Sequence, residues 1–410
     1  MALEGRDLIS IFDFSDREIE AVFDLADEMS QHTRGRLGLA DGLIMCTLFY
    51  EPSTRTRLSF EAAMHRLGGN VLSVADTSAT SVKKGETIAD TVRIIESYAD
   101  LIVIRNPYEG SAKVAADFAS VPVINAGDGP HEHPTQTLLD LYTIRREKGK
   151  LKDLSVALVG DLRYGRTVHS LAFGLARFGA KVTLVAPKGL EMPAHLLARL
   201  EQEFGLRPAQ YQSLTEIVTN QEATKRRPGK QRALATEVLS LFDVFYVTRV
   251  QKERFEKGDH YLEAALSYGE TPEALARARP DALVMHPLPR VDEIHYRFDR
   301  DPRAAYFRQA AYGLPVRMAL VAAILGRRTA RVHKARPGDY KPEPRHEVDF
   351  RKLAPVRCQN ARCITNHEGY LTPQFYFSGL GSGDSGLGTQ IACTYCEHEM
   401  PAPLGVEAKS

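Results

Sequence analysis

The sequence predicts two parallel-sheet α/β domains separated by a cleft, followed by a small β module at the C-terminus. Three observations support this fold class. Short apolar runs alternate with helical patterns, which is typical of buried parallel strands that helices connect. The alternation restarts near residue 150, and a chain of 410 residues is long enough for two or three domains. A proline-rich, charged stretch then separates a cysteine-bearing segment from the rest of the chain.

The first domain is expected over residues 1–148. Apolar runs rich in β-branched residues predict its strands, at 43–51, 70–75, 101–106 and 121–126. Periodic apolar residues predict its helices, at 59–69, 86–100 and 134–149. In the first of these helices Phe60, Met64 and Leu67 share one face, and Gly68 is expected to end the helix.

The second domain is expected over residues 149–305, with the same alternation. Its strands are predicted at 155–161, 181–187, 244–249 and 282–289. Residues 306–330 are interpreted as closing helices that pack back on the first domain. A charged stretch at 221–236 is interpreted as an exposed insertion, and residues 331–346 as a linker to a module at 347–410.

The bulk composition excludes several classes of protein. The net charge is +1, whereas a wide nucleic-acid footprint needs a strong excess of basic residues. No apolar run reaches the roughly 18 residues that a membrane span needs, and no signal peptide is visible at the start. We therefore expect no nucleic-acid partner, no membrane contact and a cytoplasmic location.

Residues 53–57 place Ser-Thr-Arg-Thr-Arg between an apolar run and a helix. The first turn of a helix has unpaired N–H groups and a partial positive charge, and the hydroxyls and Arg55 add further donors. Parallel sheets bind ligands at the carboxyl ends of their strands, where this turn is expected. The stretch therefore predicts a pocket for an anion such as phosphate. The alternative is an ordinary helix cap with solvated arginines.

A loop at residues 80–85 is a second candidate for anion binding. Ser81, Lys83 and Lys84 precede Gly85, and a helix is expected directly afterwards. Lysines on a loop with a glycine hinge can reach an anionic ligand. A solvated loop with a helix cap is the alternative.

His133 and Gln136 lie at the start of the helix expected at 134–149. A histidine there can donate a hydrogen bond to a carbonyl oxygen, and a glutamine can accept one from an amide. His131 and His133 could instead bind a metal, but the sequence offers no third ligand nearby.

Three clusters of the second domain also follow predicted strands. Arg166 lies in a glycine-bracketed turn that differs from a phosphate-binding P-loop by having arginine in place of lysine, and its forked group suits a carboxylate. Arg249 and Gln251 follow the next such strand. Pro287 and Pro289 lack N–H groups, so the carbonyls around them can accept from a ligand NH2.

Together these clusters indicate one anion-binding pocket in the cleft between the two domains. The sequence shows no nucleophilic serine or cysteine beside a base, and no acidic metal-binding cluster. The site is therefore expected to hold anions in position, without a covalent intermediate.

Taken in order, the clusters resemble the catalytic chains of the aspartate carbamoyltransferase family over about residues 5–328. The related ornithine enzymes share the S-T-R-T-R and H-P-x-Q patterns, but carry His-Cys-Leu-Pro where this chain has His-Pro-Leu-Pro-Arg at 286–290. Arg249 and Gln251 also resemble the aspartate type. The resemblance implies synthesis of N-carbamoyl-L-aspartate for pyrimidine biosynthesis, with no cofactor for catalysis.

The resemblance also implies how carbamoyl phosphate is held. Its phosphate would be bound by the first helical turn, at Ser53, Thr54, Arg55 and Thr56. Arg105 would bridge the phosphate and the carbonyl oxygen. Arg105, Thr56 and His133 would polarise the carbonyl and stabilise the oxyanion. The carbamoyl NH2 would be held by Gln136 and by the carbonyls of Pro287 and Leu288.

For aspartate, the resemblance assigns the α-carboxylate to Arg166 and the β-carboxylate to Arg249, with Gln251 in support. Ser81 and Lys84 are expected to enter the site of a neighbouring subunit, where Lys84 contributes to aspartate binding. Activity would then require a homotrimer. The aspartate amine would attack the carbonyl carbon directly, so positioning and charge stabilisation supply the catalysis.

Four of the five cysteines form two close pairs near the C-terminus, Cys358, Cys363, Cys393 and Cys396. Their C-x4-C and C-x2-C spacings suit a tetrahedral structural zinc, whereas disulfides would need an oxidising compartment. The module has few apolar residues, so it is expected to need the metal to fold. Cys46 stands alone in an apolar run and is interpreted as a buried thiol.

Residues 347–402 resemble the zinc domain of the regulatory chain that partners this enzyme in some bacteria. No counterpart of that chain's nucleotide-binding domain is visible. The expected role is assembly, in which the module docks on a neighbouring catalytic subunit and pairs trimers. Nucleic-acid binding is the weaker alternative, because the charge is balanced and no basic helix is present.

Two other readings of the whole chain remain open. One is a related carbamoyltransferase with another amino acceptor. The other is a catalytically inactive scaffold in which only the zinc module has a function. The complete set of Arg55, Arg105, His133 and Arg166 argues against the scaffold.

Overall fold

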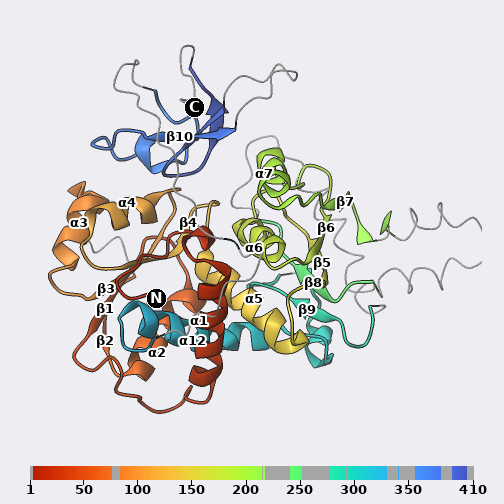
Figure 1. Cartoon of the computed structure of the whole chain (residues 1–410), viewed down its shortest axis with the longest axis horizontal. Helices are drawn as coiled ribbons and strands as arrows, with labels where there is room; N and C mark the ends of the chain where they lie inside the picture. Colours follow the sequence, from red (N-terminus) through yellow and green to blue (C-terminus); the bar gives the residue numbers. More distant parts are fainter. Residues whose placement is uncertain are drawn as a thin grey trace, which may run out of the picture. The chain divides into compact units, whose positions relative to one another are not determined.

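The computed structural model describes most of the chain (Figure 1), namely residues 3–75, 84–214, 216–217, 241–251, 278–291, 293–329, 340, 356–379 and 390–403. The chain forms two compact units, unit 1 (Met1–Pro134 with Met318–Ser410) and unit 2 (Thr135–Arg317). The insertion expected at 221–236 lies outside the described residues, as does the expected linker apart from Tyr340. In the described part, no helix is long and apolar enough to cross a membrane.

Unit 1 contains a four-stranded parallel sheet with the order β2–β1–β3–β4. Its elements before α5 are η1 (Ile11–Asp13), α1 (Asp16–Ser30), β1 (Ile44–Phe49), α2 (Thr54–Leu67), β2 (Asn70–Val74), α3 (Ile88–Ile95), β3 (Leu101–Asn106), α4 (Ser111–Phe118) and β4 (Val123–Asp128). Side chains of β1, β3 and β4 are almost all buried, whereas the edge strand β2 is largely exposed. The four predicted strands are confirmed.

Local sequence explains where α2 begins and ends. The helix ends as predicted at Gly68, whose φ of 102° is left-handed. A Cβ at this position would lie 2.5 Å from Asp41 Oδ1, so only glycine fits without a shift. The helix begins earlier than predicted, at Thr54, so the Ser-Thr-Arg-Thr-Arg stretch forms its first turn.

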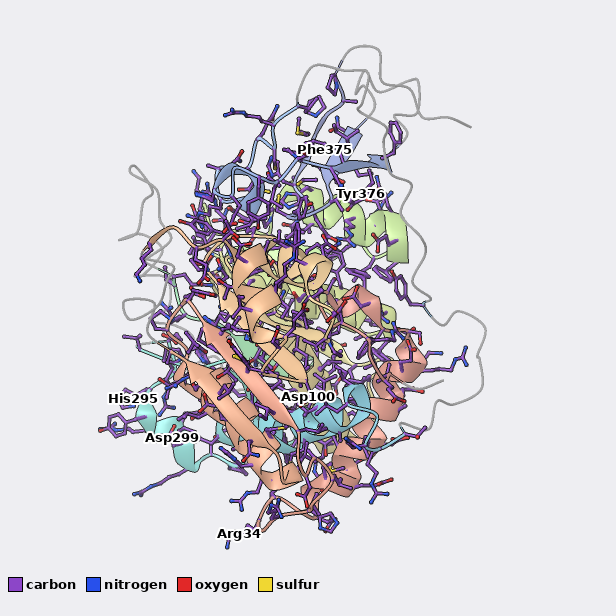
Figure 2. The ribbon with its side chains drawn as sticks, turned by 90° about the vertical axis from the view of Figure 1, so that its left-hand side faces the viewer. Arg34, Asp100, His295, Asp299, Phe375 and Tyr376 are labelled. Carbon is purple, nitrogen blue, oxygen red and sulfur yellow. The ribbon has the colours of Figure 1, made fainter. Side chains whose placement is uncertain are left out.

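The C-terminal part of unit 1 is a separate small antiparallel sheet of β10 (Phe375–Gly379), β11 (Gln390–Cys393) and β12 (Glu399–Pro401), preceded by η7 (Ile364–Asn366). Phe375 and Tyr376 lie side by side on β10 (Figure 2), and Phe375 is buried while Tyr376 is partly exposed. This module is the β module that the sequence predicts.

Unit 2 is built on a five-stranded parallel sheet with the order β7–β6–β5–β8–β9. Its elements are α5 (Pro134–Lys148), β5 (Ser155–Val159), α6 (Arg166–Arg177), β6 (Lys181–Val185), α7 (Ala194–Phe204), β7 (Ala209–Tyr211), β8 (Val244–Val247), β9 (Leu283–Met285), η6 (Tyr296–Arg300) and α12 (Tyr306–Ile324). Helix α12 is a single helix that starts in unit 2 and ends in unit 1. The compact units therefore divide near the start of α5 and inside α12.

Candidate active site and metal centre

The predicted anion-binding turn lies at the carboxyl end of β1, where α2 begins. Ser53 takes the N-cap position, yet its side chain makes no capping hydrogen bond within the described structure. Thr54 and Arg55 are exposed, whereas Thr56 is buried. The N-cap hydroxyl is thus not used for capping, and the anion site stays a prediction.

The second arginine of the stretch, Arg57, has a different environment. Its Nη1 lies 3.2 Å from Ser73 Oγ on β2 and 3.7 Å from Glu61 Oε1, one turn along α2. These contacts hold α2 to the edge strand. Arg57 is therefore a structural residue of the turn.

Arg105 lies near the end of β3, paired with Phe49 of the neighbouring β1. Its Nη2 lies 2.9 Å from Glu51 Oε2, and its Nη1 donates to the carbonyl of Ala126 at 3.4 Å. These contacts hold the guanidinium at the carboxyl edge of the sheet, beside the anion-binding turn. Glu51 was not among the predicted site residues, although its place between β1 and the turn was a signal.

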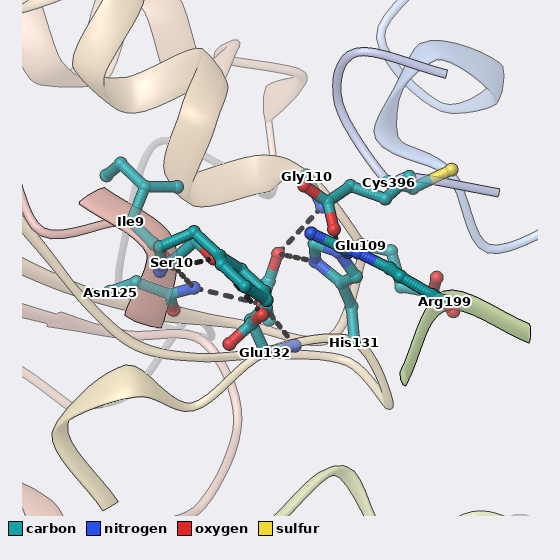
Figure 3. A network of polar contacts seen from close by, with 12 residues as sticks. Ile9, Ser10, Glu109, Gly110, Asn125, His131, Glu132, Arg199 and Cys396 are labelled. Atoms are coloured by element: carbon teal, nitrogen blue, oxygen red, sulfur yellow. Dashed lines mark hydrogen bonds and ion pairs between the residues drawn. The ribbon is translucent and has the colours of Figure 1, made fainter. Parts of the chain in front are cut away.

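The loop that leads to His133 is fixed by the buried carboxylate of Asp128, and Figure 3 labels its three partners Asn125, His131 and Glu132. Asp128 Oδ1 accepts hydrogen bonds from Asn125 Nδ2 and from the N–H of Glu132, both at 3.0 Å. Asp128 Oδ2 lies 3.0 Å from His131 Nδ1. His133 follows directly and is buried, 3% exposed. Because His131 pairs with Asp128, the alternative of a metal site at these histidines gains no support.

The structure describes only one of the two residues that are expected to reach a neighbouring subunit. Ser81 lies outside the described residues. Lys84 is exposed and lies four residues before the start of α3. Its role in a neighbouring subunit stays a prediction.

In unit 2, Asp161 organises the turn that carries Arg166. Asp161 Oδ1 accepts the N–H of Tyr164 at 2.9 Å, and Oδ2 accepts the N–H of Gln251 at 3.0 Å. Gln251 Nε2 donates in return to the carbonyl of Tyr164 at 2.9 Å. Arg166 is buried at the start of α6, and Arg249 is half-buried just after β8. The structure thus brings Gln251 against the turn of Arg166.

The turn after β9 carries the carbonyls of Pro287 and Leu288. His286 Nδ1 accepts the N–H of Leu288 at 2.8 Å, so Nε2 carries the proton and donates to Glu293 Oε1 at 2.7 Å. Burial raises the pKa of Glu293, but hydrogen bonds from His286 and the backbone outweigh it and lower the pKa overall. The imidazole therefore works as a fixed brace for this turn.

Apart from Ser81, Lys84 and Gln136, the predicted substrate-binding residues follow the same pattern in their own sheets. In unit 1 they lie at the carboxyl ends of β1, β3 and β4, and in unit 2 at those of β5, β8 and β9. Parallel strands end at one edge, so each unit presents its predicted residues along a single sheet edge.

The four predicted zinc ligands come together in the module. Their Sγ atoms all lie within 4.8 Å of one another, with Cys358 and Cys396 at 3.5 Å and Cys363 and Cys393 at 3.7 Å. A tetrahedron of sulfurs at a Zn–S distance of ~2.3 Å has edges of ~3.8 Å, so the thiols fit a zinc ion. The separations are too long for disulfides. All four cysteines are buried, as a closed structural site requires.

The metal-binding module packs on the rest of unit 1 through a short backbone bridge. Glu109 donates its N–H to the carbonyl of Arg362 at 3.0 Å and accepts the N–H of Ile364 at 2.9 Å. Its side-chain Oε2 accepts from Asn360 Nδ2 at 2.7 Å. Burial raises the pKa of Glu109 to about 6. The bridge places the ligand segment of the module directly on the loop between β3 and α4.

The module also covers the start of α3. The N–H of Ile88 donates to Glu368 Oε1 at 3.2 Å, and that of Ala89 donates to the hydroxyl of Tyr370 at 3.3 Å. The ring of Tyr370 packs edge-on against Phe118 of α4, with centroids 5.8 Å apart. These N–H groups belong to the first turn of α3, so the module supplies part of its N-terminal cap.

A third contact links the module to the loop of His133. Glu397 Oε2 lies 3.7 Å from His131 Nε2. Burial lowers the pKa of His131, but the carboxylates of Asp128 and Glu397 outweigh it and raise the pKa well above its ordinary value. A Cβ at Gly110 would lie 2.6 Å from the carbonyl of Tyr395, so glycine permits this close approach. The module thus packs on its own chain, and docking on a neighbouring subunit stays a prediction.

Three family models match the chain. Residues 6–146 match the aspartate/ornithine carbamoyltransferase carbamoyl-P binding domain, and residues 152–324 match the Asp/Orn binding domain of the same enzymes. Residues 353–402 match the metal binding domain of the aspartate carbamoyltransferase regulatory chain.

Named relatives and solved structures cover the first two domains. The aspartate carbamoyltransferase catalytic subunit of Thermoplasma acidophilum is 47% identical over 326 residues, which is 79% of this chain and 99% of that protein. The corresponding subunit of Thermococcus onnurineus is 48% identical over 328 residues, or 80% of this chain and 99% of that protein.

Among solved structures, the catalytic subunit of M. jannaschii aspartate transcarbamoylase is 44% identical, with a TM-score of 0.67 over 78% of this chain and 98% of that one. The Trypanosoma cruzi enzyme in complex with N-(phosphonacetyl)-L-aspartic acid is 39% identical, with a TM-score of 0.69 over 79% and 97%.

The chain therefore belongs to the aspartate/ornithine carbamoyltransferase family, and it is a carbamoyltransferase enzyme. Within that family it groups with the aspartate carbamoyltransferases, and it carries the metal-binding domain of their regulatory chain on the same polypeptide. The resemblance inferred from the sequence is confirmed for both parts.

Proposed function

We propose that this enzyme transfers the carbamoyl group of carbamoyl phosphate to the amino group of L-aspartate, giving N-carbamoyl-L-aspartate and phosphate. The observation that carries the proposal is the placement of the predicted substrate-binding residues at the carboxyl edges of both parallel sheets. The names of the relatives support the same reaction. As part of the proposal, the reaction takes place in the cytoplasm, where five cysteines without disulfides are expected.

Unit 1 would bind carbamoyl phosphate. The first turn of α2 offers N–H groups, hydroxyls and the exposed Arg55 to the phosphate. Arg105 would exchange its partner Glu51 for the phosphate and the carbonyl oxygen. Arg105, Thr56 and His133 would then stabilise the negative charge that develops on that oxygen.

Unit 2 would bind the carbamoyl NH2 and aspartate. Gln136 and the carbonyls of Pro287 and Leu288 would accept from the NH2 group. Arg166 would hold the α-carboxylate, and Arg249, supported by Gln251, the β-carboxylate. Lys84 and Ser81 would reach the aspartate site of a neighbouring subunit in a homotrimer.

In the reaction the aspartate nitrogen forms a bond to the carbamoyl carbon, and the bond from that carbon to the phosphate oxygen breaks. We propose that the departing phosphate takes the proton of the amine, since the predicted site contains no evident side-chain base for it. A pH profile that needs an essential side-chain base in the enzyme–substrate complex would contradict this step.

Product analysis tests the reaction as a whole. With carbamoyl phosphate present, aspartate should give carbamoylaspartate and phosphate in equal amounts, and ornithine should give no product. Faster turnover of ornithine or another amine would identify a related carbamoyltransferase. Absence of turnover together with failure to bind a phosphonate bisubstrate analogue would identify an inactive scaffold.

Replacing Arg166 with alanine should damage aspartate recognition. The two-point contact of an arginine with a carboxylate is a charge-assisted pair, so KM for aspartate should rise about 100-fold while KM for carbamoyl phosphate changes little. Arg163→Ala is the matched control, because this exposed arginine of the same turn donates to the carbonyl of Gly189 and lies over the Tyr164 ring, and it has no predicted role in substrate binding. Equal effects of the two variants would contradict the assignment.

The native mass should be that of a trimer both before and after zinc is removed with a mercurial reagent. This expectation follows from in-chain docking, which already occupies the contacts of the module with α3 and the Glu109 loop. Light scattering on both samples gives the measurement. A hexamer that falls to active trimers would instead show that the module pairs trimers, as the sequence first suggested.

A further inference from the structure

A buried carboxylate lies beside the segment that our proposal assigns to the carbamoyl NH2. Asp140 is on α5, one turn after Gln136, and its side chain is 0% exposed. Its Oδ1 accepts hydrogen bonds from Gln136 Nε2 at 2.9 Å and from Gln309 Nε2 at 2.6 Å. Its Oδ2 accepts from the hydroxyl of Tyr246 at 2.7 Å. All four residues belong to unit 2.

Gln309 links Asp140 to the turn at 286–288, which is the second segment that our proposal assigns to the carbamoyl NH2. Its Oε1 accepts the backbone N–H of His286 at 2.9 Å. His286 is the residue before Pro287, and its ring braces the N–H of Leu288. A continuous chain of hydrogen bonds therefore runs from Gln136 through Asp140 and Gln309 to the turn at 286–288.

The chemistry of the site requires an ionised carboxylate. Three donors point at Asp140, and only the anion can accept from all of them without offering a proton of its own. Burial raises the pKa of Asp140 to about 7, while hydrogen bonds from Tyr246, Gln309 and Gln136 and the charge of Arg317 act in the opposite direction. Above that pH the carboxylate form holds all three donors.

This arrangement fixes the direction of the Gln136 amide. A glutamine amide has a donor end and an acceptor end that can exchange by rotation. Because Asp140 holds the NH2 end, the amide oxygen faces the other way. A carbamoyl NH2 can donate only to that oxygen, and it would meet a second donor if the amide turned around.

We propose that Asp140 is a positioning residue for carbamoyl phosphate, and that Gln309 carries the same function to the Pro287–Leu288 carbonyls. Asp140 fixes the direction of the Gln136 amide oxygen, and Gln309 fixes the position of the turn at 286–288. The amide oxygen and the two carbonyls of that turn can then accept from the same NH2 group. The inference rests on the proposed function and deepens it. The site would then recognise the carbamoyl group of the substrate as well as its phosphate.

The test compares the binding of carbamoyl phosphate and inorganic phosphate to the full-length protein by calorimetry at about pH 8, where Asp140 is ionised. Asp140→Asn should weaken carbamoyl phosphate binding about 10- to 100-fold, the value of a charge-assisted hydrogen bond. Inorganic phosphate, which would use the anion-binding turn of unit 1, should bind as in the original protein. Gln309→Met is a second variant, with the same expected selective loss.

Thr143→Val is the matched control for these variants. Thr143 is buried on the same helix, and its hydroxyl bonds only the carbonyl of Leu139 among the interactions resolved here. This isosteric change should leave the preference for carbamoyl phosphate over phosphate intact. Circular dichroism melting identifies any variant that fails to fold, in which case the other variant decides.

Gln136→Ala separates failure of the inference from failure of the proposed function. If Gln136→Ala loses the preference and both Asp140→Asn and Gln309→Met keep it, the positioning role is wrong and the proposed function stands. Equal weakening of both ligands by the Asp140 variant would show a merely structural role. If the original protein itself shows no preference for carbamoyl phosphate, the proposed function is wrong.

Discussion

Replacing Cys363 with serine should abolish stoichiometric zinc binding and unfold the C-terminal module. The four buried thiols form one ligand set, and structural zinc sites of this kind supply about 10–16 kcal/mol of folding free energy. Cys363 also pairs through its backbone with the Glu109 loop, so the disturbance starts at the contact with the rest of unit 1. Few apolar residues remain to hold the module once the metal is lost.

Hydrogen exchange measures this result residue by residue. The amides of Ile88, Ala89 and Ile364 should lose protection in the variant, because their acceptors lie across the contact between the module and the rest of unit 1. Cys46→Ala is the control, since Cys46 is buried on β1 and is not part of the ligand set. A Cys363 variant that keeps one zinc ion per chain and normal protection would overturn the zinc assignment.

Replacing Arg105 with alanine should lower kcat/KM by about 1,000-fold, because one side chain would both bind the phosphate and stabilise the oxyanion. The loss should appear mainly in kcat when both substrates are saturating. It would also leave Glu51 without its guanidinium partner at 2.9 Å, which adds repulsion toward the incoming phosphate. Steady-state kinetics with varied carbamoyl phosphate provides the measurement.

Arg66→Ala is the control for Arg105. Arg66 lies in the last turn of α2, and its Nη1 donates to the carbonyl of Gly35 at 3.2 Å. Its loss should change kcat/KM by no more than about twofold, since it removes one exposed contact at the helix end. A similar fall in both variants would mean that Arg105 acts through stability and not through the transition state.

The parts of the fold that repeat a local pattern could be predicted from the sequence. Apolar β-branched runs predicted every strand of the two parallel sheets except the short edge strand β7, and Gly68 marked the end of α2 because its left-handed backbone needs glycine. The spacing of the four cysteines predicted that their sulfurs meet, and they do. In each case the determining interactions lie within a few residues in sequence or follow from metal-ligand chemistry.

The parts that depend on distant segments could not be predicted in this way. Asp140 looks like any polar residue of an amphipathic helix until Tyr246 and Gln309 enclose it from elsewhere in the chain. The docking of the module on its own chain rests on Glu109 and Ile88, which carry no local sign of a partner more than 250 residues away. The positions assigned to substrates remain predictions until binding is measured.

The cap on α3 has a consequence for how the protein is made. The N–H groups of Ile88 and Ala89 are synthesised early, whereas Glu368 and Tyr370, which receive them, are added about 280 residues later in translation. Until then Thr87 accepts the N–H of Asp90, and the N–H groups of Ile88 and Ala89 must donate to water. A later-made segment with its metal therefore completes a helix of an earlier-made domain, and without zinc the first turn of that helix would stay without these two acceptors.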